Sequence, residues 1–201
     1  VGYKSGQLDL AQVLSRVPGL QSALSPDVLL CEQFANIDSK DLEHEDWALL
    51  VGHVSRHLAS PDVRSVVITH GTDTLEETAF FLASVLPPDL LKHKAVVLTC
   101  AMRPANFKEA DGPQNLRDAL TVAAVAQGAG VWMVAAGEIH HSQHVQKVHP
   151  TRVNAFDSGE AGLAGTVKND QVAWRSGFKC AAMTCAMPAR HPPRAPKSAV
   201  R

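Results

Sequence analysis

Short β-branched runs alternate with segments of helical spacing along most of the chain. A run such as Ala95–Thr99 has the length and composition of a buried strand, whereas Leu75–Leu86 repeats its apolar residues with the period of a helix. The whole pattern predicts helices at Leu8–Arg16, Glu43–Leu58, Leu75–Leu86 and Gly112–Gln127, and strands at Val28–Ala35, Val63–Thr69, Ala95–Thr99 and Gly130–Ala136.

Such alternation predicts an α/β fold with three layers, in which a mostly parallel sheet carries helices on both faces. We expect one domain over residues 1–170, because 201 residues are the length of a single domain of ordinary size. Residues 171–201 contain six basic residues, four prolines and no acidic residue. Prolines disfavour helices and central strands, so we expect a disordered basic tail rather than a second folded unit.

The segment from Val66 to Thr78 carries the clearest candidate chemistry. Thr72, Asp73 and Thr74 follow a predicted strand and precede a predicted helix, with Gly71 allowing the turn between them. Ligands of open α/β sheets bind at such strand-to-helix corners, where backbone N–H groups favour a carboxylate or a developing oxyanion. The alternative is that these three side chains only cap the helix.

Composition excludes several classes of function. The net charge is −1, which predicts no general affinity for nucleic acid or other polyanions. No apolar run approaches the ~20 residues that a membrane span needs. The four cysteines form no Cys-x-x-Cys pair, and we interpret them as free thiols, which favours a reducing compartment such as the cytoplasm. The chain begins with Val1, so a signal peptide removed upstream is the open alternative.

The residues of the chain match neither a zinc site nor a nucleotide-binding motif. His140, His141, His144 and His149 are close in sequence, but a zinc site needs three or four converging ligands, and we place this segment in a loop after a strand. Neither Gly-x-Gly-x-x-Gly nor a P-loop occurs in the chain. We therefore predict no metal and no cofactor.

Three segments in register resemble the bacterial-type L-asparaginase family. They are His70–Thr78 (His-Gly-Thr-Asp-Thr-Leu-Glu-Glu-Thr), Ala101–Pro104 (Ala-Met-Arg-Pro) and Asp111–Leu116 (Asp-Gly-Pro-Gln-Asn-Leu), with Cys100 where glycine is usual in the family. The match in order and spacing runs from about Gly2 to Val167. The resemblance implies the large N-terminal α/β domain of the asparaginase fold, without its first strand and without the small C-terminal domain.

The resemblance also implies roles for individual residues. Thr72 matches the threonine that attacks or supports attack on the side-chain amide, and Lys147 matches the lysine that makes this hydroxyl more nucleophilic. Asp73 matches the aspartate that binds the α-ammonium group of the substrate. A threonine hydroxyl is a weak nucleophile that needs such a base, and an aspartate can orient a lysine or bind an ammonium group.

Three further residues match the family's substrate contacts. Ser39 matches the serine that holds the substrate α-carboxylate, and Lys40 stands where many relatives have glutamine. Tyr3 matches the tyrosine of a mobile loop that closes over the site and excludes water.

The implied activity is hydrolysis of the side-chain amide of L-asparagine to L-aspartate and ammonia, with L-glutamine as a second candidate substrate. We expect a homo-oligomer, dimer or tetramer, with a small-molecule substrate and with neither a nucleic-acid nor a membrane partner. The family's Thr-Gly-Gly-Thr motif, which carries its primary nucleophile, does not occur in the chain, so we expect impaired activity. The alternatives are an inactive asparaginase-like remnant and an amidase-like component that acts on amidated tRNA.

Overall fold

The computed structural model describes residues 10–17, 19–20, 29–125 and 130–176. Its centre is a sheet of six strands in the order β1-β2-β3-β4-β7-β8. The strands are β1 (Ser65–Thr69), β2 (Ala95–Thr99), β3 (Gly130–Ala135), β4 (Glu138–His141), β7 (Gly165–Lys168) and β8 (Gln171–Trp174). Two residues each of β5 (Gln146–Lys147) and β6 (Phe156–Asp157) form a separate antiparallel pair.

Strands β1, β2 and β3 are parallel, with Val66 opposite Val96 and Val96 opposite Val131. The sheet then continues through antiparallel β4, β7 and β8, and is therefore mixed. The residues of β2 and β3 are buried throughout, as expected for strands covered on both faces.

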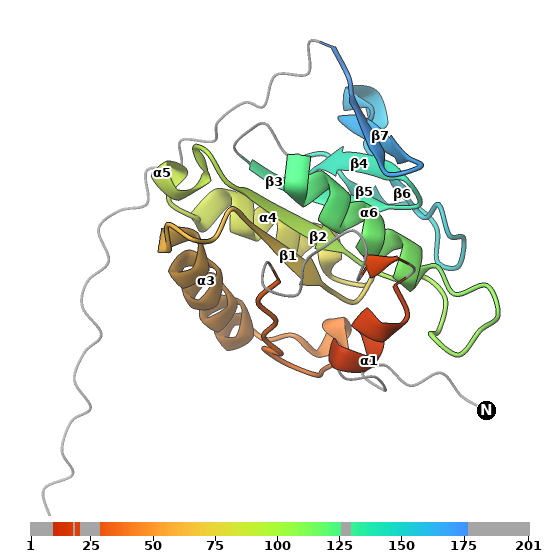
Figure 1. Ribbon diagram of the computed structural model, residues 1–201, viewed down its shortest axis with the longest axis horizontal. Coiled ribbons are helices and arrows are strands. Elements are labelled where there is room, and N and C mark those ends of the chain that lie inside the picture. The colour runs from red at the N-terminus through yellow and green to blue at the C-terminus, as the bar shows by residue number, and fades with distance from the viewer. Residues whose placement is uncertain (1–9, 18, 21–28, 126–129, 177–201) are drawn as a thin grey trace, which may run out of the picture.

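Helices cover both faces of this sheet, which confirms the predicted three-layer α/β fold (Figure 1). One face packs against α3 (His44–Ala59), α4 (Leu75–Val85) and α5 (Pro88–Leu91), with Val96 and Leu98 of β2 in that core. The opposite face packs against α6 (Gly112–Val125). Val97 faces α6 because successive side chains of a strand point to opposite faces.

Most predicted elements lie within two residues of the observed ones. The predicted helix at Leu8–Arg16 corresponds to α1 (Leu10–Ser15), whose preceding residues lie outside the described part of the chain. A short 3-10 helix, η2 (Ser39–Asp41), precedes α3, and a second, η3 (Gly159–Ala161), precedes β7.

The predicted strand at Val28–Ala35 is wrong, since residues 29–36 form no strand in the structure. Leu30 is 74% exposed, so the apolar run is not buried. Side chains attach the segment to α3 instead: the Glu32 carboxylate accepts hydrogen bonds from Arg56 at 3.0 and 3.1 Å, and the His57 ring nitrogen lies 2.7 Å from it. The segment is thus held to α3 by side-chain contacts, and not to a neighbouring strand by backbone hydrogen bonds.

The predicted boundary at residue 171 also needs correction. Gln171–Trp174 form β8, which pairs with β7 through a tight turn at Asn169 and Asp170. Both turn residues have positive φ, 50° and 60°, as the two-residue hairpin turn requires. The remainder of the predicted tail, from residue 177 onward, lies outside the described residues.

Candidate active site

The corner between β1 and α4 brings together the residues expected from the second catalytic motif. The Lys147 amine donates to the Thr72 hydroxyl at 2.8 Å and to the Asp73 carboxylate at 2.7 Å. The Lys147 side chain is 18% exposed and that of Asp73 is 52% exposed, so the ion pair lies at the surface with its cation shielded. A hydroxyl, an amine and a carboxylate in this order can activate a nucleophile.

Ser39 supports the same corner from η2. Its hydroxyl oxygen accepts the backbone N–H of Asp73 at 3.2 Å, and its carbonyl accepts the Thr74 hydroxyl at 2.8 Å. Because the Thr74 side chain is used in this way, it makes no capping hydrogen bond to α4. The structure therefore does not favour the capping interpretation for Thr74, the residue at the N-cap position.

Lys40, another predicted site residue, pairs with its neighbour in η2. The Lys40 ammonium donates to the Asp41 carboxylate at 2.5 Å, and its side chain is 58% exposed. This hydrogen bond is the main reason why the pKa of Lys40 is raised, and Asp73 adds to the effect through its charge. Tyr3 lies outside the described residues.

Glu76, which sequence reasoning did not select, contacts the site through its carboxylate. A Glu76 oxygen accepts the backbone N–H of Lys147. The partner is a main-chain group 71 positions away, so no local pattern in the sequence could have indicated the contact.

A partly buried hydrogen-bond network adjoins the corner. The Trp47 indole donates to the Thr78 hydroxyl oxygen at 3.0 Å, and His70 Nε2 lies 3.1 Å from the same atom. His70 Nδ1 is 2.7 Å from the Gly71 carbonyl, so this nitrogen carries the proton. Burial lowers the pKa of His70, which favours the neutral ring. The network holds the end of β1 against α4.

The Asp-Gly-Pro-Gln-Asn-Leu segment has a structural role at the carboxyl edge of the sheet. The Asp111 carboxylate accepts the backbone N–H groups of Met102 and Arg103, both at 2.9 Å. Asn115 donates to the Cys100 carbonyl at 2.9 Å and accepts the Ala136 N–H at 2.9 Å. These bonds connect α6 to the ends of β2 and β3. Asn115 also donates to the carboxylate of Asp111, the residue before α6, at 3.1 Å. Their spacing of four positions is the sequence signal that could have indicated this bond.

Cys100 lies on the same side of the molecule and is buried. Its pKa is raised to about 12, mainly by burial and further by the charge of Asp111, while Lys147 opposes the shift. A thiol in this state is not a nucleophile near neutral pH.

The histidine segment is only partly in a loop: His140 and His141 belong to β4, whereas His144 lies in the turn after it and His149 follows β5. His140 Nδ1 lies 2.8 Å from the Ser158 hydroxyl, and the His141 ring packs edge-on against Trp132 with centroids 5.2 Å apart. Among the residues that the structure describes, no three metal-ligating side chains are arranged to hold a metal ion. No helix in this part of the chain is long and apolar enough to cross a membrane.

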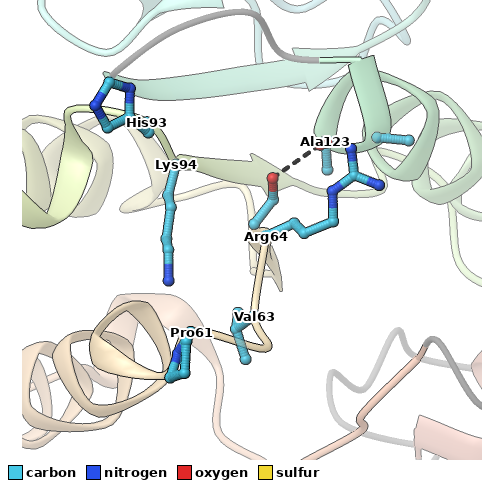
Figure 2. Close-up of a pocket in the computed structure, with 8 residues that line it drawn as sticks. Pro61, Val63, Arg64, His93, Lys94 and Ala123 are labelled. Atoms are coloured by element: carbon cyan, nitrogen blue, oxygen red, sulfur yellow. Dashed lines mark hydrogen bonds between the residues drawn. The ribbon is translucent and has the colours of Figure 1, made fainter.

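A pocket of about 200 Å³ lies at the opposite end of the sheet, where β1 and β2 begin (Figure 2). Lys94 extends from its wall and donates to the carbonyls of Leu58 and Ser60, at 2.7 and 2.6 Å. The Ser65 hydroxyl donates to the Ala123 carbonyl at 2.8 Å, the bond drawn in Figure 2. These polar groups close the ends of α3 and α6, and nothing in the pocket resembles the chemistry around Thr72.

The family model for the N-terminal domain of asparaginase matches residues 2–179. L-asparaginase 2 of Bacillus subtilis is 35% identical over 170 residues, which are 84% of this chain and 44% of that protein. The probable periplasmic L-asparaginase of Haemophilus influenzae is 38% identical over 172 residues, 85% of this chain and 47% of that protein. The chain thus spans about half the length of the curated relatives it matches.

A solved structure agrees with the sequence relatives. The crystal structure of a probable cytoplasmic L-asparaginase from Campylobacter jejuni superposes with a TM-score of 0.77 at 33% identity, over 85% of this chain and 52% of that one. The fold is therefore the α/β fold of an asparaginase domain. The chain belongs to the asparaginase family, and the described residues form its N-terminal domain.

Proposed function

We propose that the domain hydrolyses the side-chain amide of L-asparagine to L-aspartate and ammonia, with Thr72 as nucleophile. The observation that carries the proposal is the contact of the Lys147 amine with both the Thr72 hydroxyl and the Asp73 carboxylate. The names of the relatives, all L-asparaginases, give the substrate class.

The proposed reaction begins when Lys147 accepts the hydroxyl proton of Thr72. The Thr72 oxygen then forms a bond to the amide carbon, the carbon–nitrogen bond breaks, and the Lys147 proton leaves with the amine as ammonia. Water next attacks the aspartyl ester and restores the Thr72 hydroxyl. The Asp73 carboxylate, which accepts a hydrogen bond from the same amine, is the proposed partner of the substrate α-ammonium group.

Slow turnover of the 201-residue chain is part of the proposal. The Asp73 side chain is 52% exposed, so solvent water reaches the ion pair and weakens its electrostatic effect. Ser39 and Lys40 remain proposed substrate contacts, and Ser39 is hydrogen-bonded directly to Asp73 of the corner.

The test is ammonia release from L-asparagine by the purified chain, with L-glutamine measured in parallel. Thr72→Ser keeps a hydroxyl and should retain activity, whereas Thr72→Ala should abolish it. Release at an equal rate from Thr72→Ala overturns the role of Thr72. Absence of release from the unaltered chain overturns activity of the domain on its own and favours the inactive-remnant alternative.

We propose a cytoplasmic location on separate grounds. Cys31 and Cys100 are both free thiols in the described part of the chain, and Cys31 is exposed. Exposed free thiols persist in reducing compartments. Fractionation of the source cells, with antibodies to the chain, should recover it in the cytoplasmic fraction, and recovery in the extracellular fraction or in a membrane-bounded compartment contradicts the proposal.

The homo-oligomer expected from the family also stands as a proposal. Leu49 on α3 and Phe80 on α4 are 58% and 48% exposed, and such apolar side chains are available for contact with another subunit. Light scattering after size-exclusion chromatography measures the mass directly, and a monomer at micromolar concentration contradicts the proposal.

A further inference from the structure

The strand that carries Lys147 is not part of the main sheet. In the described residues β5 pairs only with β6, through two residues of each strand. The main-sheet ladder therefore does not fix the position of Lys147 relative to Thr72 and Asp73. An activated threonine requires this position to be accurate, because a displacement of about 1 Å can cost about 100-fold in rate.

Glu76 provides the missing connection. It is the second residue of α4, it is half-buried, and its carboxylate accepts the backbone N–H of Lys147. Thr72 and Asp73 precede it by four and three positions, and both contact the amine of the same lysine. One short corner of the chain therefore binds Lys147 at two points, at its main chain and at the end of its side chain.

We propose that Glu76 is a positioning residue that holds Lys147 at hydrogen-bonding distance from Thr72. This inference rests on the function proposed above and adds to it a residue that does not touch the substrate. A hydrogen bond to a carboxylate is roughly twice as strong as one between neutral groups, which makes Glu76 an effective clamp for a strand of two residues.

Two alternatives to the proposed role of Glu76 predict different experimental results. As an acidic residue in the first turn of α4, Glu76 could act only by favourable interaction with the helix dipole. Glu77 has the same charge in the same turn, is exposed, and so provides a matched control. Alternatively, Val145, which is buried in the core two residues before Lys147, could hold β5 without help.

The experiment compares Glu76→Ala, Glu76→Gln, Glu76→Asp and Glu77→Ala in the full chain. Gln keeps the reach and an accepting oxygen but loses the charge, whereas Asp keeps the charge but is too short to reach the N–H group. We expect Glu76→Ala and Glu76→Asp to lower kcat for ammonia release roughly 10–100-fold, with KM changed less than about twofold. Glu76→Gln should recover most of kcat, and Glu77→Ala should match the unaltered chain.

A second readout does not depend on activity. The rate at which an acetylating N-hydroxysuccinimide ester modifies Lys147 is measured by peptide mapping. We expect it to rise several-fold in Glu76→Ala and Glu76→Asp, because a displaced amine is more accessible than the present one, whose side chain is 18% exposed. Glu77→Ala should leave this rate unchanged.

The outcomes separate the two proposals. If the unaltered chain releases no ammonia, the proposed activity fails, while the acetylation rates still decide the role of Glu76. A better result for Asp than for Gln assigns Glu76 to the helix dipole and overturns the inference. Equal rates in all four variants show that Val145 suffices, and overturn it as well. If Glu76→Ala does not fold, the comparison of Gln with Asp decides alone.

Discussion

The backbone at Gly71 lies so close to Ser39 that no side chain fits between them. A Cβ atom on Gly71 would stand 2.5 Å from the Ser39 hydroxyl oxygen and 2.7 Å from its Cβ. The sequence suggested that Gly71 is needed for the conformation of a turn, but Gly71 is not among the glycines with positive φ. It is needed because η2 and the β1–α4 corner touch at this point. This contact brings the Ser39 hydroxyl oxygen to the N–H group of Asp73.

Gly71→Ala should therefore destabilise the domain and displace Thr72. We expect a loss of about 1–3 kcal/mol in the free energy of unfolding by urea, together with a fall in any amidase activity. Gly52→Ala is the control, because Gly52 lies in α3 with no atom within 4 Å of the added Cβ, and alanine favours a helix. In Gly71→Ala/Ser39→Gly the clash is removed, so the two losses should be less than additive. Simple additivity contradicts the steric explanation.

Lys147→Met should lower kcat by roughly 100- to 10,000-fold, because the Thr72 hydroxyl loses its base. Groups that act as one unit give non-additive losses, so Thr72→Ala/Lys147→Met should be no slower than Thr72→Ala alone. Initial rates of ammonia release over a range of asparagine concentrations measure both effects. Independent, multiplying losses would mean that the 2.8 Å contact between the two side chains is not used in the reaction.

Hydrophobic periodicity predicted the strands that lie between the two helix layers. Because β2 and β3 are buried on both faces, each is a continuous apolar run in the sequence. The same periodicity wrongly predicted a strand at residues 29–36, where side chains make the contacts to the rest of the domain. It also missed the antiparallel half of the sheet. The turn at Asn169 and Asp170 carries a recognisable hairpin signal, whereas the one at Ala136 and Gly137, with φ of 52° and 76°, contains an alanine that gives no such signal.

The candidate site divides in the same way. Thr72 and Asp73 were predictable from a local pattern, since a strand end and a helix start adjoin in the chain. Lys147 was identified only through the family resemblance, because 75 positions separate it from Thr72. Glu76 was missed because its carboxylate binds a backbone N–H group. Every residue except proline has such a group, so the sequence does not mark this partner.

Asn115→Leu should cost about 2–5 kcal/mol, because the buried Cys100 carbonyl and the Ala136 N–H both lose their partner. Asn115 is 2% exposed, and its amide bonds both the Cys100 carbonyl and the Ala136 N–H. Thr121→Ala on the same helix removes only a bond to the Arg117 carbonyl one turn earlier, and should change stability by less than about 0.5 kcal/mol. Urea titration of both variants tests the contrast, and an equally small effect of both contradicts the role of Asn115.

Acidification should destabilise the domain through the two buried histidines of β4. Burial lowers the pKa of His140 and of His141 to about 4, and the charge of His144 adds to the effect on His141. Because the unfolded chain binds these protons near pH 6.5 and the folded chain does not, stability is complete above pH 6.5 and falls toward pH 4. The slope is about 1.4 kcal/mol per pH unit for each histidine. Glu138, whose pKa is raised by burial, opposes the change.

A variant separates the histidine contribution from that of Glu138. His140→Asn keeps a polar partner for Ser158 but has no proton to gain, so it should reduce the slope between pH 6.5 and 5 by up to about 1.4 kcal/mol per pH unit. Thr121→Ala changes no titratable group and should not alter the slope. Urea midpoints at pH 7.5, 6.5, 5.75 and 5 give the slopes. If His140→Asn and the unaltered chain have the same slope, the acid sensitivity of the domain arises outside β4.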